Sequence, residues 1–242
     1  SIGMTAAAIH ILVLRISVDA NVIRWSSPPA IVGCFISVLT LGRWLDMGAI
    51  RLGFTVLLVA LACGLILQQK IKHHVKSMKI IPFKLTERII IAAAGFLGGI
   101  ISGVLGIGEN TILFAILVLF FKVSEKVATP TTVVVMAMVS VAAFLTHLLI
   151  LDDVSSESFS RWQAAAPICA IGAPIGAYIA SQLSAAFIRN ILIFLILLDL
   201  LSTIFLVPIT VVGALIAACL LAALIVVFCF LIQFHRPENE QY

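Results

Sequence analysis

The sequence has 242 residues, of which 62% are apolar and only 11% are Asp, Glu, Lys or Arg. Soluble globular domains contain roughly 45–50% apolar and about 25% charged residues, and they bury about 70–75% of their surface on folding. This composition excludes a disordered chain, a disulfide-stabilised secreted module and an ordinary soluble enzyme. It predicts an integral, multi-pass membrane protein, in which the positions of the charges matter more than the net charge of +4.

Apolar stretches long enough to cross a bilayer, about 20 residues each, follow one another along the chain. The predicted spans are 1–16, 28–44, 49–68, 128–151, 162–182, 187–206 and 209–233. A further stretch, 89–121, is too long for one span and is interrupted at 106–110 by the sequence GIGEN. Its halves, 89–105 and 111–121, are each short for a crossing. No segment alternates as a strand does, which predicts an all-α fold and excludes a β-barrel.

Basic residues gather in the linker 69–88, which holds six of the fifteen lysines and arginines. The positive-inside rule predicts that this linker is cytoplasmic, and a nucleic-acid role for it is not favoured. If 89–121 enters and leaves on the same side, Lys122 and Lys126 are also cytoplasmic and the acidic loop 152–161 is external. A single crossing by 89–121 would reverse each of these assignments. The charges therefore favour a re-entrant pair of half-helices.

An internal repeat is indicated by three polar anchors that recur in order at offsets of 137 or 138 residues. The matches are His10 with His147, Arg24-Trp25 with Arg161-Trp162, and Ile50-Arg51 with Ile188-Arg189. Each copy contains three crossings, and because three is odd the second copy must be inverted relative to the first. Inverted repeats with broken helices are typical of secondary transporters.

These features predict the domain organisation. The first repeat, 1–68, is incomplete; the basic linker 69–88 follows; the second repeat, 89–206, contains the broken helix at 106–110; and 207–242 adds one extra helix and a tail. The counterpart of 89–137 is expected upstream of Ser1, because the chain starts inside an apolar run. That start has no basic segment of the kind that opens a signal peptide.

Several motifs resemble those of one transporter family. The glycine-rich run Gly95–Gly108 (GFLGGIISGVLGIG), Val127–Thr132 (VATPTT), His147 and Ile171–Ala177 (IGAPIGA) resemble the sulfite exporter TauE/SafE family, mainly over 88–206. The resemblance implies a polytopic carrier of small sulfur-containing anions such as sulfite, sulfoacetate or thiosulfate. The sequence departs from the family pattern after Gly108, where Glu109 and Asn110 replace the usual glycines.

The break at 106–110 is the candidate binding site. Gly106 and Gly108 permit a turn and a close approach of a ligand, while Asn110 and Thr111 are suited to cap the second half-helix. The N–H groups of 108–111 would then point at the break and attract an anion. Gly95, Gly99 and Gly103 have the alternative role of letting helices pack closely.

Other polar residues complete the candidate site. Thr129, Thr131 and Thr132 are predicted to open the next helix around Pro130, with the hydroxyls of Thr131 and Thr132 beside the anion. Glu109 either takes up a proton when the anion binds, which would couple transport to protons, or only caps the half-helix. His147 is a second candidate for proton coupling, with an interfacial, hydrogen-bonded role as the alternative. The substrate-binding set is Gly106, Gly108, Glu109, Asn110, Thr111, Thr131 and Thr132.

Enzymatic motifs are missing from the sequence: it contains no HExxH, GxSxG or GxxxxGK[ST]. Five cysteines in apolar stretches, with no CxxC pair, indicate packing rather than metal or redox chemistry. We expect no catalytic residues, cofactor, metal or nucleic acid, and partners limited to a small anion, the bilayer of the cell membrane and a homo-oligomer or larger complex. The predicted function is secondary anion transport; a structural or accessory subunit descended from such a carrier, or a passive channel, are the alternatives.

Overall fold

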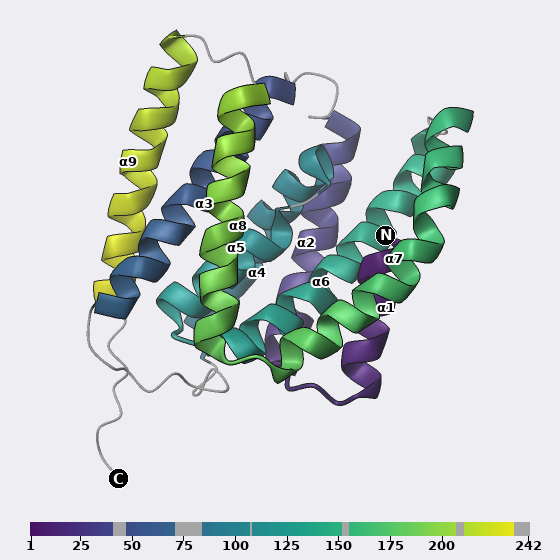
Figure 1. Ribbon diagram of the computed structural model, residues 1–242, viewed down its shortest axis with the longest axis horizontal. Helices are drawn as coiled ribbons and strands as arrows, with labels where there is room; N and C mark the ends of the chain where they lie inside the picture. Colours follow the sequence, from purple (N-terminus) through teal and green to yellow (C-terminus); the bar gives the residue numbers. More distant parts are fainter. Residues whose placement is uncertain (41–46, 71–83, 107, 152–154, 207–210, 235–242) are drawn as a thin grey trace.

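The computed structural model describes residues 1–40, 47–70, 84–106, 108–151, 155–206 and 211–234. Within these ranges the elements are helical, as predicted (Figure 1). They are α1 (Ile2–Val13), α2 (Ala20–Thr40), α3 (Met47–Lys70), α4 (Leu85–Leu105), α5 (Glu109–Ala115), the π-helix η2 (Ile116–Phe120), α6 (Glu125–Thr146), the π-helix η3 (His147–Leu151), α7 (Ser156–Gln182), α8 (Ala185–Leu206) and α9 (Val211–Phe234). Most of the basic linker, Ile107 in the break, Asp152 and Asp153 of the acidic loop, and the tail lie outside the described residues.

Five of the described helical segments are long and apolar enough to cross a membrane: Ala20–Thr40, Leu85–Leu105, Glu125–Leu151, Phe159–Gln182 and Ala185–Leu206. Helix α1 has 12 residues and is therefore about 18 Å long, less than the roughly 30 Å of a bilayer core. The predicted span 1–16 is thus shorter in the structure than a full crossing. Segment Glu109–Phe120 is also short, as predicted for one half of a broken helix.

Several helices begin before the apolar windows from which they were predicted. Helix α2 starts at Ala20 because the Oδ1 atom of Asp19 accepts hydrogen bonds from the N–H groups of Asn21 and Val22, at 3.1 and 3.4 Å. This side-chain cap satisfies donors that the first helical turn leaves free. Polar first turns therefore precede the apolar part of the helix, and apolar windows alone underestimate its length.

The half-helix after the break lies at the centre of the molecule. In Figure 1, α4 and α5 lie between a group formed by α3, α8 and α9 and a group formed by α1, α6 and α7. Leu113, Leu117 and Leu119 of α5 and η2 are at most 1% exposed, and they belong to the largest buried apolar cluster. The break therefore lies where the two groups of helices meet.

Glycines join α4 to α2. A Cβ atom at Gly95 would lie 2.5 Å from the carbonyl oxygen of Ser26, and Cβ atoms at Gly99 and Gly103 would collide with Ala30 and Cys34. Because both sets of residues advance by four, the two helices run parallel. Close packing is thus confirmed as the role of the glycines at four-residue spacing.

Polar pairs fix α3 against α8. The Nη2 atom of Arg51 donates to Oγ of Ser202 at 3.0 Å, and Oγ1 of Thr55 donates to Oδ2 of Asp199 at 2.9 Å. The colours in Figure 1 show that α3 and α8 run in opposite directions, so these two helices are antiparallel.

Candidate functional site

The break after α4 depends on two glycines. Gly106 has φ +74° and donates its N–H to the carbonyl of Ser102 at 2.7 Å, while Gly108 has φ +145°. These backbone conformations favour glycine. A Cβ atom at Gly108 would also collide with the side chain of Ile101, whereas one at Gly106 would meet no atom within 4 Å. Gly108 is therefore required for both conformation and space, and Gly106 for conformation alone.

The second half-helix begins earlier than predicted. Gly108 is its N-cap residue and Glu109 its first helical residue, with no side-chain capping bond. The expectation that Asn110 and Thr111 cap this helix is wrong: both lie inside the first turn, where Oγ1 of Thr111 donates to Oδ1 of Asn110 at 3.4 Å. The strained glycine takes the cap position because only glycine fits between the turn and Ile101.

Glu109 is fully buried at the break. It is 0% exposed, and neither carboxyl oxygen has a hydrogen-bond partner in the part of the chain that the structure describes. Gly98 of α4 lies directly against its backbone, since a Cβ atom there would be 2.8 Å from Cα of Glu109. This contact folds α5 back on α4. A carboxyl group in such surroundings is costly to keep charged.

The predicted start of the next helix needs correction. Helix α6 begins at Glu125 after the extended N-cap Ser124. Thr129, Thr131 and Thr132 therefore lie beyond the first turn, and so does Pro130, which lies in the interior of the helix. Pro130 was predicted in the first turn, but the chain becomes helical again at Glu125, five residues after η2 ends at Phe120.

The hydroxyls of the two site threonines have partners on nearby backbone. Oγ1 of Thr131 donates to the carbonyl of Val127 at 2.6 Å and accepts from the N–H of Asp19 at 3.0 Å. Oγ1 of Thr132 donates to the carbonyl of Thr129 at 3.0 Å. Thr131 thereby ties the start of α2 to α6, and neither hydroxyl bonds to residues 108–111 in this conformation.

Neither His10 nor His147 is hydrogen-bonded to Glu109 in the part of the chain that the structure describes. His147 is half-buried at the start of η3, and since Glu109 has no hydrogen-bond partner, the two candidates for proton coupling are not joined by a hydrogen bond. His10 lies edge-on to the ring of Tyr178, with ring centroids 6.5 Å apart. The ring contact agrees with a packing role for His10.

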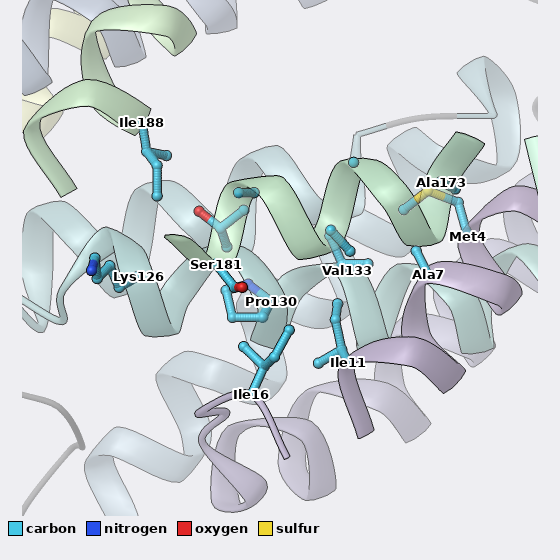
Figure 2. A pocket seen from close by; sticks show the side chains of 14 residues that line it. Met4, Ala7, Ile11, Ile16, Lys126, Pro130, Val133, Ala173, Ser181 and Ile188 are labelled. Carbon is cyan, nitrogen blue, oxygen red and sulfur yellow. The ribbon is translucent and has the colours of Figure 1, made fainter. Parts of the chain in front are cut away.

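A cavity of about 270 Å³ lies between α1, α6 and α7 (Figure 2). Lys126 lies at one end and Met4 and Ala173 at the other, with Pro130 and Val133 between them. Thr129 and Gly176, both from the recognised motifs, also line it. From the sequence, Lys126 was predicted only to lie on the cytoplasmic side. Its position four residues before Pro130 places it on the same helix face, so α6 brings a cation to this cavity.

A larger cavity, about 490 Å³, adjoins the break between α3, α4, α5 and α9. Ile101, Leu105 and Ile112 line it, together with other exclusively apolar residues and Gly53. It offers no polar side chain to an anion, and its chemistry suits a hydrocarbon chain. Among the described residues, no group of three or more His, Cys, Asp or Glu side chains could hold a metal ion.

Comparison with known proteins identifies the family. The model of the family described as "Sulfite exporter TauE/SafE" matches residues 1–203, which is most of the chain. The chain belongs to the sulfite exporter TauE/SafE family. The match extends over 1–68, where the motifs were faint, and it makes the chain a multi-pass membrane protein of an anion-exporter type. Neither a curated protein nor a solved structure matches the chain.

Proposed function

We propose that this member of the TauE/SafE family is a secondary transporter that carries a small sulfur-containing anion and couples its movement to protons through Glu109. The observation that carries the proposal is the burial of Glu109, unpartnered, at the first residue of a broken helix. Ionisable groups at membrane depth are rare, and they commonly mark ion pathways. A carboxyl group that changes its charge with the bound anion would link the two movements.

The proposed anion site is the break itself. Backbone N–H groups of 108–111, at the start of the half-helix, would bind the anion, and Gly106 and Gly108 would let it approach. Asn110 and Thr111 would contribute polar side chains to the anion site from the first turn of α5. Thr131 and Thr132 serve the site from α6, where Thr131 holds the start of α2 in place.

The transport cycle would use an inverted repeat, with α4 and α5 forming a re-entrant pair. The relative directions of two pairs of helices support the inverted repeat. Counterparts α3 and α8 are antiparallel, and in Figure 2 the numbering of α1 and α6 also rises in opposite directions. In the predicted repeat, α1 corresponds to α6 and α2 corresponds to α7. The contact of α1 with α7 therefore has the contact of α6 with α2 as its counterpart. Such symmetry lets one bundle rock against the other around a fixed site.

The test is anion binding to the purified protein in lipid bilayers across a pH series, with sulfite, sulfoacetate and thiosulfate as ligands. Glu109→Gln keeps the shape of the side chain and fixes it in a neutral form. We expect the variant to bind the anion with an affinity that no longer depends on pH. Glu157→Gln is the matched control, because Glu157 is exposed and paired with Arg161, and it should keep the wild-type pH dependence.

Two results would count against the proposal. Unchanged pH dependence in Glu109→Gln would refute coupling through this residue. If none of the three anions bound to the wild-type protein, the alternative function, a structural or accessory membrane subunit, would be favoured. The replacement of the usual family glycines by Glu109 and Asn110 is the feature that favours this alternative.

A further inference from the structure

The cavity between α1, α6 and α7 changes in character from one end to the other. Figure 2 shows Lys126 at one end, Ser181 and Pro130 next to it, and Met4 with Ala173 at the far end. A cation and a hydroxyl group therefore lie toward one end of the cavity, and hydrocarbon side chains surround the other end. A ligand that matches both ends has a polar head and an apolar tail.

The polar end of the cavity lies near a membrane surface. Helices α6, α7 and α8 each contain a candidate membrane span. Lys126 is the second residue of α6, Ser181 is the last but one of α7, and Ile188, which also lines the cavity, is the fourth of α8. All three residues thus lie at an end of a span. From Lys126 to Val133, α6 advances seven residues into the membrane, about 10 Å, against roughly 15 Å for one leaflet of the hydrocarbon core.

Small residues of α7 leave the space open. Ala173, Gly176, Ala177 and Ala180 line the cavity from this helix, and a Cβ atom at Gly176 would meet no atom within 4 Å. A cavity with apolar walls is a poor site for water, because water needs several polar partners. Within the bilayer, a hydrocarbon chain is the occupant whose chemistry fits these walls.

The charge of Lys126 is not balanced within the cavity. Among the described residues that line the cavity there is no Asp or Glu. The acidic residues nearest along the packed elements have other roles: Glu125 is 0% exposed and pairs with Arg189 at 3.4 Å, and Asp19 is 3% exposed and caps α2. The start of α6 adds the positive end of a helix dipole beside Lys126. The polar end of the cavity therefore favours an anion.

We propose that this cavity binds an anionic phospholipid of the surrounding leaflet, with its phosphate group at Lys126 and one acyl chain between α7 and the pair α1 and α6. A small free anion would pair with Lys126 but leave the apolar end of the cavity empty. A zwitterionic lipid would bring a cation of its own to Lys126. The bound lipid would hold α7 against α6, the helix that carries Thr131 and Thr132. The proposal depends neither on Glu109 nor on which anion is carried.

Native mass spectrometry of the protein purified in a neutral detergent tests the proposal. The protein is titrated with dioleoylphosphatidylglycerol, which is anionic, or with dioleoylphosphatidylcholine, which has the same acyl chains and no net charge. We expect saturable binding of one phosphatidylglycerol molecule per chain, tighter than the binding of phosphatidylcholine. Equal affinity for the two lipids, or no saturable binding of either, would show the proposal to be wrong. Glycerol phosphate should not displace the lipid, and displacement by this head group alone would also overturn the proposal.

The contribution of the cation is measured with Lys126→Gln. One lysine near an anionic lipid surface contributes an attraction that corresponds to about fivefold in affinity. We therefore expect a loss of about fivefold for phosphatidylglycerol and no change for phosphatidylcholine. Lys84→Gln is the matched control, because Lys84 is an exposed cation just before α4 and does not line the cavity. Wild-type affinity in Lys126→Gln, or an equal loss in both variants, would contradict a head-group site at Lys126.

The place of the acyl chain is tested by filling the cavity. Gly176→Leu would put a side chain into the open space and should abolish the saturable binding. Gly172→Leu is the matched control, because a Cβ atom at Gly172 also meets nothing within 4 Å and this residue does not line the cavity; it should bind the lipid as the wild-type protein does. If Gly176→Leu failed to fold, Ala180→Leu would fill the same cavity with the same expected loss. Wild-type binding by the folded, cavity-filled variant would place the lipid elsewhere and overturn the proposal.

Discussion

Among the acidic residues of the second repeat that the structure describes, Glu109 differs from the others in having no hydrogen-bond partner within the described chain. Glu125 pairs with Arg189, Glu157 with Arg161 and Asp199 with Thr55. Its place beside two glycines could be read from the sequence, because charged residues within apolar stretches are rare. Its isolation could not, since it results from the approach of Gly98 from α4. This tertiary contact makes the residue a candidate for proton coupling.

The two glycines of the break should differ in their tolerance of alanine. At Gly106 the cost is backbone strain alone, about 1–2 kcal/mol for a left-handed residue. At Gly108 the same change adds a collision with Ile101, and overpacking costs about 1–3 kcal/mol more. Thermal unfolding in detergent should therefore show Gly108→Ala to be the less stable variant. Equal stability of the two variants would show that the space beside Ile101 adjusts freely.

At the scale of helices, predictions from the sequence were good for existence and poor for boundaries. Apolar stretches located the helices because lipid requires continuous apolar segments. The first turn of α2 was missed because its cap, Asp19, lies outside the apolar window. The first turn of α6 was missed because the helix already begins at Glu125, before its apolar window. The cavity beside Lys126 was missed because it needs α1, α6 and α7 together.

The contact between α2 and α4 gives a prediction at this scale. In Gly99→Ala the new methyl group would collide with the carbonyl group of Ala30, so we expect a loss of about 1–3 kcal/mol in the free energy of unfolding. Gly172→Ala is the matched control, because a Cβ atom at this helical glycine meets nothing within 4 Å. Its stability should be unchanged or slightly greater, since alanine favours helix. If Gly99→Ala were as stable as the wild-type protein, α2 and α4 would be able to move apart to accept the methyl group.

For the whole molecule, the charge pattern predicts an orientation in the membrane. A cysteine at Ser156 should react with a membrane-impermeant thiol reagent in intact cells, because it borders the acidic loop. A cysteine at Lys84, at the end of the basic linker, should react only after the membrane is opened. The native cysteines would be replaced in both variants. Labelling of both positions from the same side of the membrane would contradict the re-entrant pair of half-helices, and reversed labelling would place the linker outside.

Membership of the TauE/SafE family and the central position of the break both favour carrier-type transport. Counterflow measures it most directly: liposomes containing the purified protein are loaded with unlabelled sulfite and diluted into a trace of radiolabelled sulfite. A carrier exchanges the two, so we predict a transient accumulation of label above its equilibrium level, with protein-free liposomes as the control. Label that only rises to equilibrium would indicate a channel, and uptake equal to that of protein-free liposomes, repeated with sulfoacetate and thiosulfate, would contradict transport by this chain.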